Sequence, residues 1–238
     1  MKLQQLYSRV RRALDDYNMI ADGDKIAIGI SGGKDSLTLL YALAGLRKFY
    51  PKKYDLVAIS VDLGIAEINM SDVQKLCEKL EVPLTLISTQ IGPIIFEERK
   101  ESSPCSLCAK MRKGALNEAA IHLGCNKVAY AHHMDDIIET MFLSMIYEGK
   151  FYTFPPVTKL DKTNLTVIRP LMYVLEADVI GFKNKYELPV VNNPCPFDHT
   201  SERSYVRQLL NEINRHAPGV KQRMMTAICD GTIPEWKK

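Results

Sequence analysis

One hexapeptide, Ser31-Gly32-Gly33-Lys34-Asp35-Ser36, constrains the fold of this 238-residue chain more than any other stretch. The residues before it, 25–30, form a short apolar run with β-branched side chains, which is typical of a buried strand. The residues after it, 37–44, have helix-forming composition and apolar side chains at helical spacing. The hexapeptide is therefore predicted to be the turn between a strand and a helix.

The same turn has the residues of a phosphate-binding loop. Gly32 and Gly33 allow a tight bend and leave no Cβ to block a ligand. The first amides of the following helix lack intrahelical partners and lie at the positive end of its dipole. The two serines add hydroxyl donors and Lys34 adds a cation, while Asp35 fits the loop if Mg²⁺ accompanies the phosphates. The alternative is an ordinary Gly-Gly turn before a helix, and the pattern is not of the Walker type.

Strand and helix patterns alternate along most of the chain. Further strands are predicted at 55–62, 83–89, 127–131 and 165–168. Helices are predicted at 3–20, 71–80 (with Ser71 as N-cap), 108–123, 135–146, 176–186 and 201–216. This alternation indicates βαβ units, and hence an α/β fold with a twisted parallel sheet and helices on both faces.

The chain divides by pattern into three parts. Residues 1–22 form an N-terminal amphipathic helix, 23–190 a central nucleotide-binding domain, and 191–238 a C-terminal helical segment. The apolar stripe of the first helix either packs on the sheet or makes a homodimer interface. Two long connections, at 86–104 and 149–164, are candidates for function because compact domains seldom keep long loops without one.

Four segments follow the carboxyl ends of predicted strands, where ligands bind in open α/β sheets. They are 31–36, Asp62–Gly64, Ser88–Thr89 and His132–Asp136, and we expect them to face one crevice. Asp135 and Asp136 either cap the helix that begins there, or one of them holds Mg²⁺ or takes a proton near the phosphates. Because consecutive side chains diverge, at most one His and one Asp of this segment should face the crevice.

Charge and hydropathy narrow the protein class. Lys and Arg number 31 against 28 Asp and Glu, and a net charge of +3 neither demands nor excludes nucleic acid. Basic residues gather near both ends, at 9–12 and at 203–223, where an RNA-binding face and a solvated helix face are both open interpretations. No apolar run reaches ~18 residues and the charged N-terminus is unlike a signal peptide, so we expect a cytoplasmic protein without a membrane span.

The six cysteines of a cytoplasmic protein should be reduced, so their spacing is read for metal or redox chemistry. Cys105 and Cys108 lie at a helix start, where i and i+3 share a face and the helix N-terminus favours thiolates. Cys195 stands between two prolines far along the chain. Three thiolates could hold three irons of a [4Fe–4S] cluster; a redox pair or buried thiols without a role are the alternatives. We expect Cys77 and Cys125 to be buried thiols without a role, and Cys229, in a C-terminal tail, to have no role either.

Together these residues resemble the PP-loop ATP pyrophosphatases, and most closely the tRNA 2-thiocytidine synthetase family of tRNA-thiolating enzymes. The resemblance extends from about Gly23 to the region of Arg207. It rests on SGGKDS (31–36), PCSLCAKMRKG (104–114), AHHMDDIIETMFLSMIYEGK (131–150), VIRPL (167–171) and PCP (194–196) before a helix with ERSYVRQLL.

The resemblance implies an enzyme that adenylates a pyrimidine C2 oxygen of tRNA with ATP and Mg²⁺ and replaces that oxygen with sulfur through a [4Fe–4S] cluster. A sulfur donor, as sulfide or on a carrier, is then required. The implied ATP-binding residues are Ser31, Gly32, Gly33, Lys34, Asp35 and Ser36, with Asp62 and His132; Asp35 also binds magnesium. The implied cluster ligands are Cys105, Cys108 and Cys195. The implied catalytic residues are Lys34, Asp136 and Arg112.

Three details separate this chain from the tRNA-thiolating families that it resembles. Arg112 stands where 2-thiouridine relatives have a catalytic Lys, and because Arg keeps its proton near neutral pH we expect only electrostatic help from it. Cys195 is followed at i+3 by Asp198 and not by a second Cys, and there is no paired-Cys zinc module. An amidotransferase or ligase of the same superfamily without a cluster, and a nucleotide-binding regulator without turnover, are the alternative functions.

Overall fold

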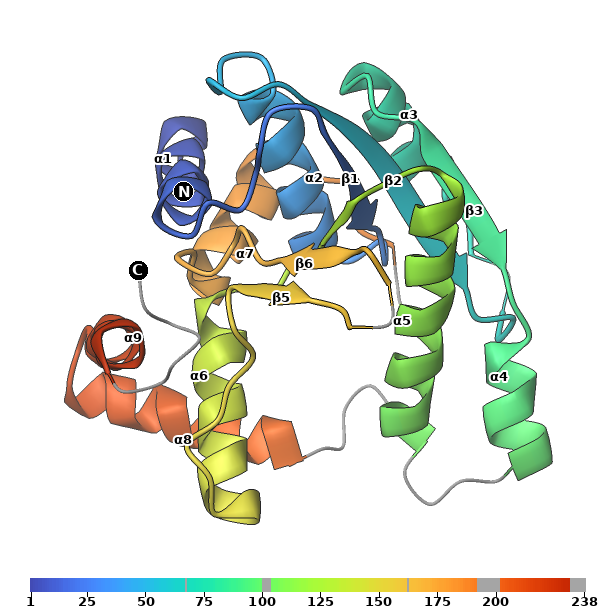
Figure 1. Ribbon diagram of the computed structural model, residues 1–238. Helices are drawn as coiled ribbons and strands as arrows, with labels where there is room; N and C mark the ends of the chain where they lie inside the picture. The colour runs from blue at the N-terminus through green and yellow to red at the C-terminus, as the bar shows by residue number, and fades with distance from the viewer. Residues whose placement is uncertain (67, 100–103, 162, 192–201, 232–238) are drawn as a thin grey trace.

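A computed structural model (Figure 1) describes all residues except 67, 100–103, 162, 192–201 and 232–238. Its centre is a six-stranded sheet in the order β3-β2-β1-β4-β6-β5. The strands are β1 (Asp24–Gly29), β2 (Tyr54–Asp62), β3 (Leu84–Ser88), β4 (Lys127–Ala129), β5 (Val157–Lys159) and β6 (Thr166–Ile168). All described pairings are parallel except that of β5 with β6. The prediction of an α/β fold built on a mostly parallel sheet is confirmed.

Helices fill the connections and cover the sheet (Figure 1). They are α1 (Leu3–Asp16), α2 (Lys34–Leu46), α3 (Ser71–Lys79), α4 (Ile91–Pro93), α5 (Pro104–His122), α6 (Met134–Leu143), α7 (Glu176–Lys185), α8 (Glu202–His216) and α9 (Val220–Asp230). Two π-helical segments, η1 (Ile94–Arg99) and η2 (Ser144–Glu148), follow α4 and α6.

The central strand β1 shows why the sheet is covered on both faces. Ile26 and Ile28 are fully buried in the large core that includes α1, α2 and α7, whereas Ala27 between them is buried in a smaller core with α5. Successive side chains of a strand point to opposite faces, so a strand buried on both faces reads as a continuous apolar run. The apolar stripe of α1 is also buried within the chain, where α1 packs against α2.

Several predicted boundaries are wrong for identifiable reasons. The first helix ends at Asp16 and not at residue 20, because Asn18 takes a left-handed φ of 46° that an α-helix does not accommodate. The N-cap of α3 is Met70, and Ser71 is the first helical residue, its amide donating to Asn69 Oδ1 at 2.9 Å. The predicted 86–104 connection contains α4 and η1.

Two further elements were missed. Strand β5 has only three residues, too few to show an alternating pattern, and it forms by pairing with β6. Helix α9 follows Pro218 and Gly219, which end the preceding pattern, and Gly219 has a φ of 79°. Cys229 therefore lies on α9, buried, with the Tyr17 hydroxyl 3.6 Å from its Sγ, and the expectation of a C-terminal tail was wrong.

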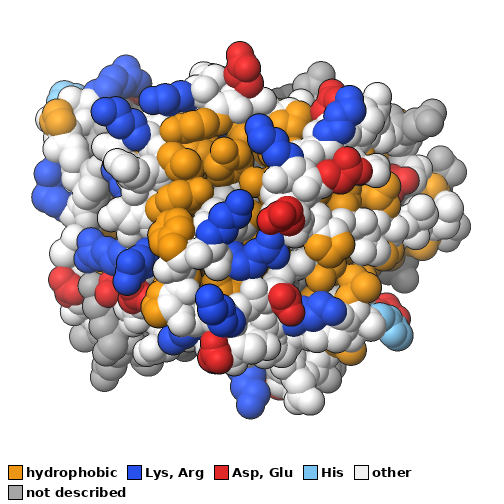
Figure 2. Space-filling view, turned by 90° about the horizontal axis from the view of Figure 1, so that it is seen from above, with side chains coloured by type: hydrophobic (Ala, Val, Ile, Leu, Met, Phe, Trp, Pro, Cys, Tyr) orange, Lys and Arg blue, Asp and Glu red, His pale blue; other side chains and the backbone are white. Residues whose placement is uncertain are grey.

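The described helices include none with the length and apolar character that crossing a membrane requires. Figure 2 shows the molecule from above, with basic and acidic side chains interspersed around an apolar area. On this face no continuous basic stripe marks a nucleic-acid site, so charge alone does not locate one here.

Candidate nucleotide and cysteine site

The loop between β1 and α2 has the shape of an anion-binding turn. Gly32 has a φ of 78°, and a Cβ added there would lie 3.0 Å from Val191 Cβ, so conformation and space both require glycine. The Ser31 hydroxyl accepts from the Gly33 amide, and the Ser36 hydroxyl donates to the Gly33 carbonyl at 2.9 Å. Helix α2 begins at Lys34, so its first amides have no intrahelical acceptor and face the loop. The hexapeptide is the predicted strand-to-helix turn.

Lys34 is held between two carboxylates. Its Nζ lies 3.0 Å from Asp35 Oδ2 and 3.1 Å from Glu176 Oε1, at the start of α7. Burial alone would lower the pKa of Lys34, but the two carboxylates outweigh it and raise the pKa. For Glu176 burial is likewise outweighed, by Lys34 and Arg207, and its pKa is lowered. A phosphate arriving at Lys34 therefore competes with these carboxylates for the ammonium.

The start of α6 meets the loop through His133, which also pairs with Asp136 of the same helix. His133 is buried, and its Nε2 lies 3.7 Å from Asp35 Oδ1. Its amide donates to Asp136 Oδ2 at 2.9 Å, and its Nδ1 accepts from the Asp136 amide at 3.3 Å, which caps the helix. Burial raises the pKa of Asp136, although His133 and Arg203 act against it. A carboxyl group whose pKa is raised is better able to accept a proton near neutral pH.

The other histidine and aspartate of 132–136, His132 and Asp135, contact different groups. Asp135 accepts from Lys221 Nζ at 2.7 Å and from the Glu176 amide at 2.7 Å. His132 lies beside Arg169, whose Nε donates to its Nδ1 at 3.2 Å, and its ring packs on that of Phe154 with centroids 4.4 Å apart. Burial, and then the charges of nearby cations led by Arg169, lower the pKa of His132 to about 3. His132 is therefore neutral at physiological pH.

Helix α8 is attached to α6 by a buried carboxylate. Glu139 is 1% exposed. It accepts from Arg207 Nε at 2.8 Å and from Arg203 Nη1 at 3.2 Å, and the same Arg203 nitrogen lies 3.8 Å from Asp136 Oδ1. Arg207 also lies 3.9 Å from Glu176, the partner of Lys34. One ion-pair network thus connects the phosphate loop, the start of α6 and the first turns of α8.

The chain before α8 also returns to the phosphate loop. The Val191 amide donates to the Gly32 carbonyl at 3.0 Å. Val191 is the last described residue before 192–201, and Glu202, the first residue of α8, follows that gap. Cys195 lies outside the described residues. The described neighbours on both sides of it are held at the phosphate loop and at α6.

The other two cysteines lie on the part of α5 that projects past the sheet. Leu116 of α5 packs over Gly29, the last residue of β1, so closely that a Cβ added at Gly29 would lie 2.9 Å from the Leu116 side chain. At 1.5 Å per residue, Cys105 lies about 16 Å further along the helix in the direction of its N-terminus. Cys105 is exposed, whereas Cys108 packs at the edge of a small core with Ile91 and Ile95. Arg112, one turn after Cys108, is exposed. Figure 1 shows this end of α5 below the sheet, on the same side as α6.

The remaining predicted nucleotide-binding residue is Asp62. It is the last residue of β2 and is exposed; its Oδ1 accepts from the Gly64 amide and its carbonyl from the Thr89 amide. Within the described part of the chain, which does not include Cys195, no three or more His, Cys, Asp or Glu side chains are grouped so that they could hold a metal ion.

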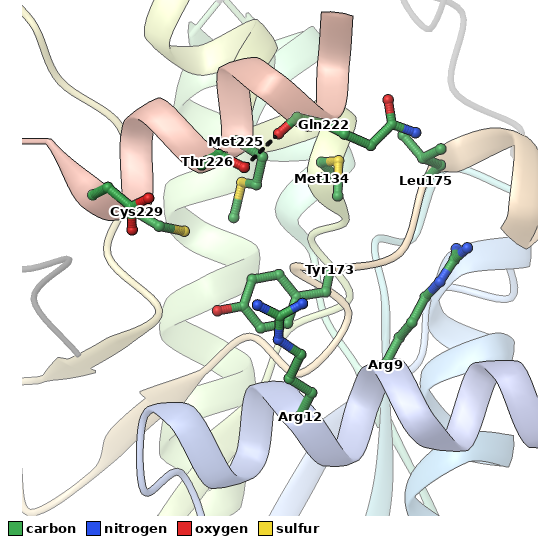
Figure 3. A pocket seen from close by; sticks show the side chains of 10 residues that line it. Arg9, Arg12, Met134, Tyr173, Leu175, Gln222, Met225, Thr226 and Cys229 are labelled. Carbon is green, nitrogen blue, oxygen red and sulfur yellow. Dashed lines mark hydrogen bonds between the residues drawn. The ribbon is translucent and has the colours of Figure 1, made fainter. Parts of the chain in front are cut away.

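A cavity of about 290 Å³ lies away from the phosphate loop, and Figure 3 shows it between α1 and α9. Met134 and Leu175 line it where α6 and α7 begin, and the guanidinium of Arg12 lies 4.7 Å from the Tyr173 ring centre. None of its lining residues belongs to 31–36, so this cavity is not where the loop would bind phosphate.

The comparisons with known proteins agree with this geometry. A family model described as a PP-loop domain matches residues 2–213. The chain belongs to the PP-loop family. The curated protein named tRNA-cytidine(32) 2-sulfurtransferase of Geobacter sulfurreducens is 38% identical over 231 residues, covering 96% of this chain and 90% of that protein. Its namesake from Aliivibrio fischeri is 37% identical over 230 residues, covering 94% and 75%. The resemblance to this branch of the PP-loop family is confirmed.

Two solved structures extend the comparison. The U34-tRNA thiolase NcsA from Methanococcus maripaludis with its [4Fe-4S] cluster superposes with a TM-score of 0.77 at 26% identity, covering 94% of the present PP-loop protein and 76% of NcsA. An NH3-dependent NAD synthetase from Campylobacter jejuni gives a TM-score of 0.53 at 14% identity, covering 100% and 97%, which is a likeness of fold.

Sequence reasoning missed several residues of this PP-loop site. His133 was treated only as one of a pair, and Glu139, Glu176 and Arg169 were given no role. A signal for Glu139 was present, since it follows Asp136 at i+3 on the same helix face inside an apolar run. Glu176 carried no such signal, because its partner Lys34 is distant in sequence and only the fold brings them together.

Proposed function

We propose that this protein is an ATP-dependent tRNA sulfurtransferase that converts a cytidine to 2-thiocytidine and carries a [4Fe–4S] cluster on Cys105, Cys108 and Cys195. The observation that carries the proposal is that Val191, four positions before Cys195, donates a hydrogen bond from its amide to the Gly32 carbonyl of the phosphate loop. Four residues of extended chain span at most about 14 Å, which is the reach that the proposal needs between Val191 and Cys195, the third proposed cluster ligand. Family membership and the curated relatives supply the substrate class.

The loop residues suit the adenylation half of the reaction. The C2 oxygen attacks the α-phosphorus of ATP, and the bond to pyrophosphate breaks. The free amides at the start of α2 and the Lys34 ammonium accept the charge that develops on pyrophosphate. Asp35 supplies a partly exposed carboxylate beside them, which fits an Mg²⁺ ligand. When the phosphates bind, they replace Asp35 and Glu176 as the partners of the Lys34 ammonium.

Asp136 and Arg112 take the roles that their surroundings allow. Asp136 is next to Asp35 through His133, and with its raised pKa it accepts a proton from the base or the incoming sulfur species. Arg112 is a permanent cation and stabilises negative charge without exchanging a proton. Neutral His132 follows β4 and exposed Asp62 ends β2, the two strands that flank β1, and both contact the nucleotide in this proposal.

The cysteines suit the second half. Cys105 and Cys108 lie three positions apart at the start of α5, where residues i and i+3 share one face of the helix. A [4Fe–4S] cluster held by three cysteines would supply an iron without a protein ligand, at which sulfide could be delivered. Sulfur adds to C2 of the activated base, and the oxygen leaves with AMP, so no net oxidation or reduction occurs.

The proposal is tested with anaerobically prepared protein, an unmodified tRNA transcript, ATP and sulfide. We expect 2-thiocytidine, measured by nucleoside mass spectrometry, with one AMP per thiolated base. Cys195→Ala should lose the visible absorbance of the cluster and the product, whereas Cys125→Ala, checked by its melting temperature, should keep both. A full cluster in Cys195→Ala protein would refute the three-ligand site.

The amidotransferase or ligase alternative predicts a different result. Under it, colourless protein prepared in air would convert ATP to AMP at the full rate with an amine acceptor and would not thiolate tRNA. The nucleotide-binding regulator predicts no conversion of ATP to AMP with any tRNA. Each outcome would leave the nucleotide pocket in place and remove the sulfur chemistry.

A further inference from the structure

An unusual share of exposed apolar surface lies on two neighbouring segments. Six of the eleven large hydrophobic side chains that the described residues expose are found there, and Phe151 is the most exposed at 77%. They are Met145, Ile146, Tyr147, Phe151, Tyr152 and, on α8, Tyr205. We call Tyr147, Phe151, Tyr152 and Tyr205 the aromatic rim. Single exposed apolar residues are ordinary, but a group of them marks an interaction surface.

The two segments adjoin at one place. The Tyr147 hydroxyl of η2 donates to the carboxylate of Glu202, the first residue of α8. This hydrogen bond raises the pKa of Tyr147, burial contributes further, and nearby Tyr205 acts in the same direction. Figure 1 shows the lower end of α6, which continues into η2, beside the beginning of α8. Tyr147 and Tyr205 are therefore neighbours although 58 positions separate them in the sequence.

The rim is joined to the strand ends by a series of side-chain contacts. Burial lowers the pKa of Arg169 to about 10, while the nearby hydroxyls of Tyr130 and Tyr152 act in the opposite direction. Arg169 Nη1 donates to the Pro155 carbonyl, and its guanidinium lies 4.8 Å from the Phe154 ring centre. Phe154 in turn packs on His132 at the end of β4. The chain from Phe151 to Phe154 thus connects exposed rings with the strand ends.

Cations accompany the rings. Lys150 is exposed next to Phe151, Arg203 lies two positions before Tyr205 with 40% of its side chain exposed, and Arg169 is beside Tyr152. Half-exposed aromatic rings interleaved with cations match single-stranded RNA, whose bases stack and whose phosphates attract positive charge. The core of a protein interface is instead depleted of charged residues.

We propose that the aromatic rim stacks the unpaired bases that flank the target nucleotide of a tRNA loop. The inference rests on the proposed function and adds the surface that holds the substrate. A target base must leave the stack for its C2 to reach the crevice, and its neighbours then lose their stacking partners. Phe151 and Tyr205 replace those partners, and Tyr152 directs the strand toward Arg169 and the strand ends.

The test uses the holoenzyme and a fluorescent, unmodified tRNA transcript. We expect Phe151→Ala combined with Tyr205→Ala to raise the Kd at least about tenfold, because each stacked base contributes substantially to such complexes. Phe151→Trp with native Tyr205 should keep wild-type affinity. The matched control is Phe49→Ala, which removes an aromatic ring of 55% exposure at the end of α2 remote from the phosphate loop.

Two further readouts separate base stacking from charge attraction and from pairing of two copies of the chain. The slope of log affinity against log salt should be unchanged in the double variant, since stacking releases no counterions, and should fall in Lys150→Ala. Wild-type tRNA affinity in the double variant would overturn the inference about the rim. The proposed function would still be upheld if the wild-type protein thiolates tRNA. A wild-type dimer that becomes monomeric in the double variant, with tRNA affinity kept, would assign the rim to a second copy of the chain instead.

Discussion

The two regions that carry the predicted site residues are built in different ways. The phosphate loop and α2 are continuous with the main core, where Leu37, Leu39 and Leu40 are fully buried. The first half of α5 projects past the sheet, and Cys105, Arg112 and Gly114 on it are exposed (Figure 1). The difference teaches that a phosphate site needs a fixed backbone, which close packing provides, whereas Cys105 lies on a part of α5 that is open to solvent.

The largest effect should come from the most constrained residue. Gly32→Ala places a Cβ at 3.0 Å from Val191 and forces a left-handed φ on alanine, so the loop amides shift. We expect turnover of ATP to fall by about 100-fold, because small misplacements of a reacting centre cause losses of that size. The matched change in the other region is Gly114→Ala, where the added Cβ meets nothing within 4 Å. It should stabilise α5 by about 1 kcal/mol in urea unfolding. Equal losses of ATP turnover in both variants would remove the contrast between the two regions.

The next largest effect concerns the attachment of α8. Glu139→Gln removes the buried charge that holds Arg203 and Arg207, and we expect a loss of about 2 to 3 kcal/mol in the free energy of unfolding, below the usual range for a buried pair because both arginines stay near water. Hydrogen exchange of α8 amides should accelerate. Glu118→Gln on α5, with a side chain 76% exposed, is the control and should change little.

A pH-dependent effect should be found at Asp135. Burial would raise the pKa of this carboxyl, but Lys221 and the Glu176 amide outweigh it and lower the pKa. A lowered pKa contributes stability that is present above the ordinary pKa of about 4 and is lost as pH falls through the lowered value. Lys221→Met should therefore cost about 2 kcal/mol at pH 7, and the difference from wild type should shrink below about pH 4. Urea unfolding at several pH values measures this, and a difference that grows in acid contradicts it.

The smallest effect sharpens the description of the phosphate loop. Glu176→Gln removes one of the two carboxylates that compete with phosphate for Lys34. Both side chains are partly exposed, so we expect only a two- to five-fold decrease in the Kd for ATP, about the strength of a partly solvated ion pair. Isothermal titration calorimetry measures it. Weaker ATP binding would mean that Glu176 assists the nucleotide and does not compete with it.

The sequence was a good guide where local rules decide the structure. The strand, glycine turn and helix at 24–46 follow from neighbouring residues, and so does the placement of His132–Asp136 after a strand. It was a poor guide where an element exists only through its partner. Strand β5 needs β6, and α1 ends early because Asn18 leaves the helix although the apolar pattern continues.

The sequence by itself determined the α/β class, the phosphate loop and the family, because these depend on short-range spacing of glycines, apolar runs and cysteines. Only the tertiary structure decided that Lys34 faces Glu176, that Glu139 holds two arginines of α8, and that Val191 returns to Gly32. Such contacts join residues far apart in the chain. Their energies depend on burial and distance, which have no value until the chain has folded.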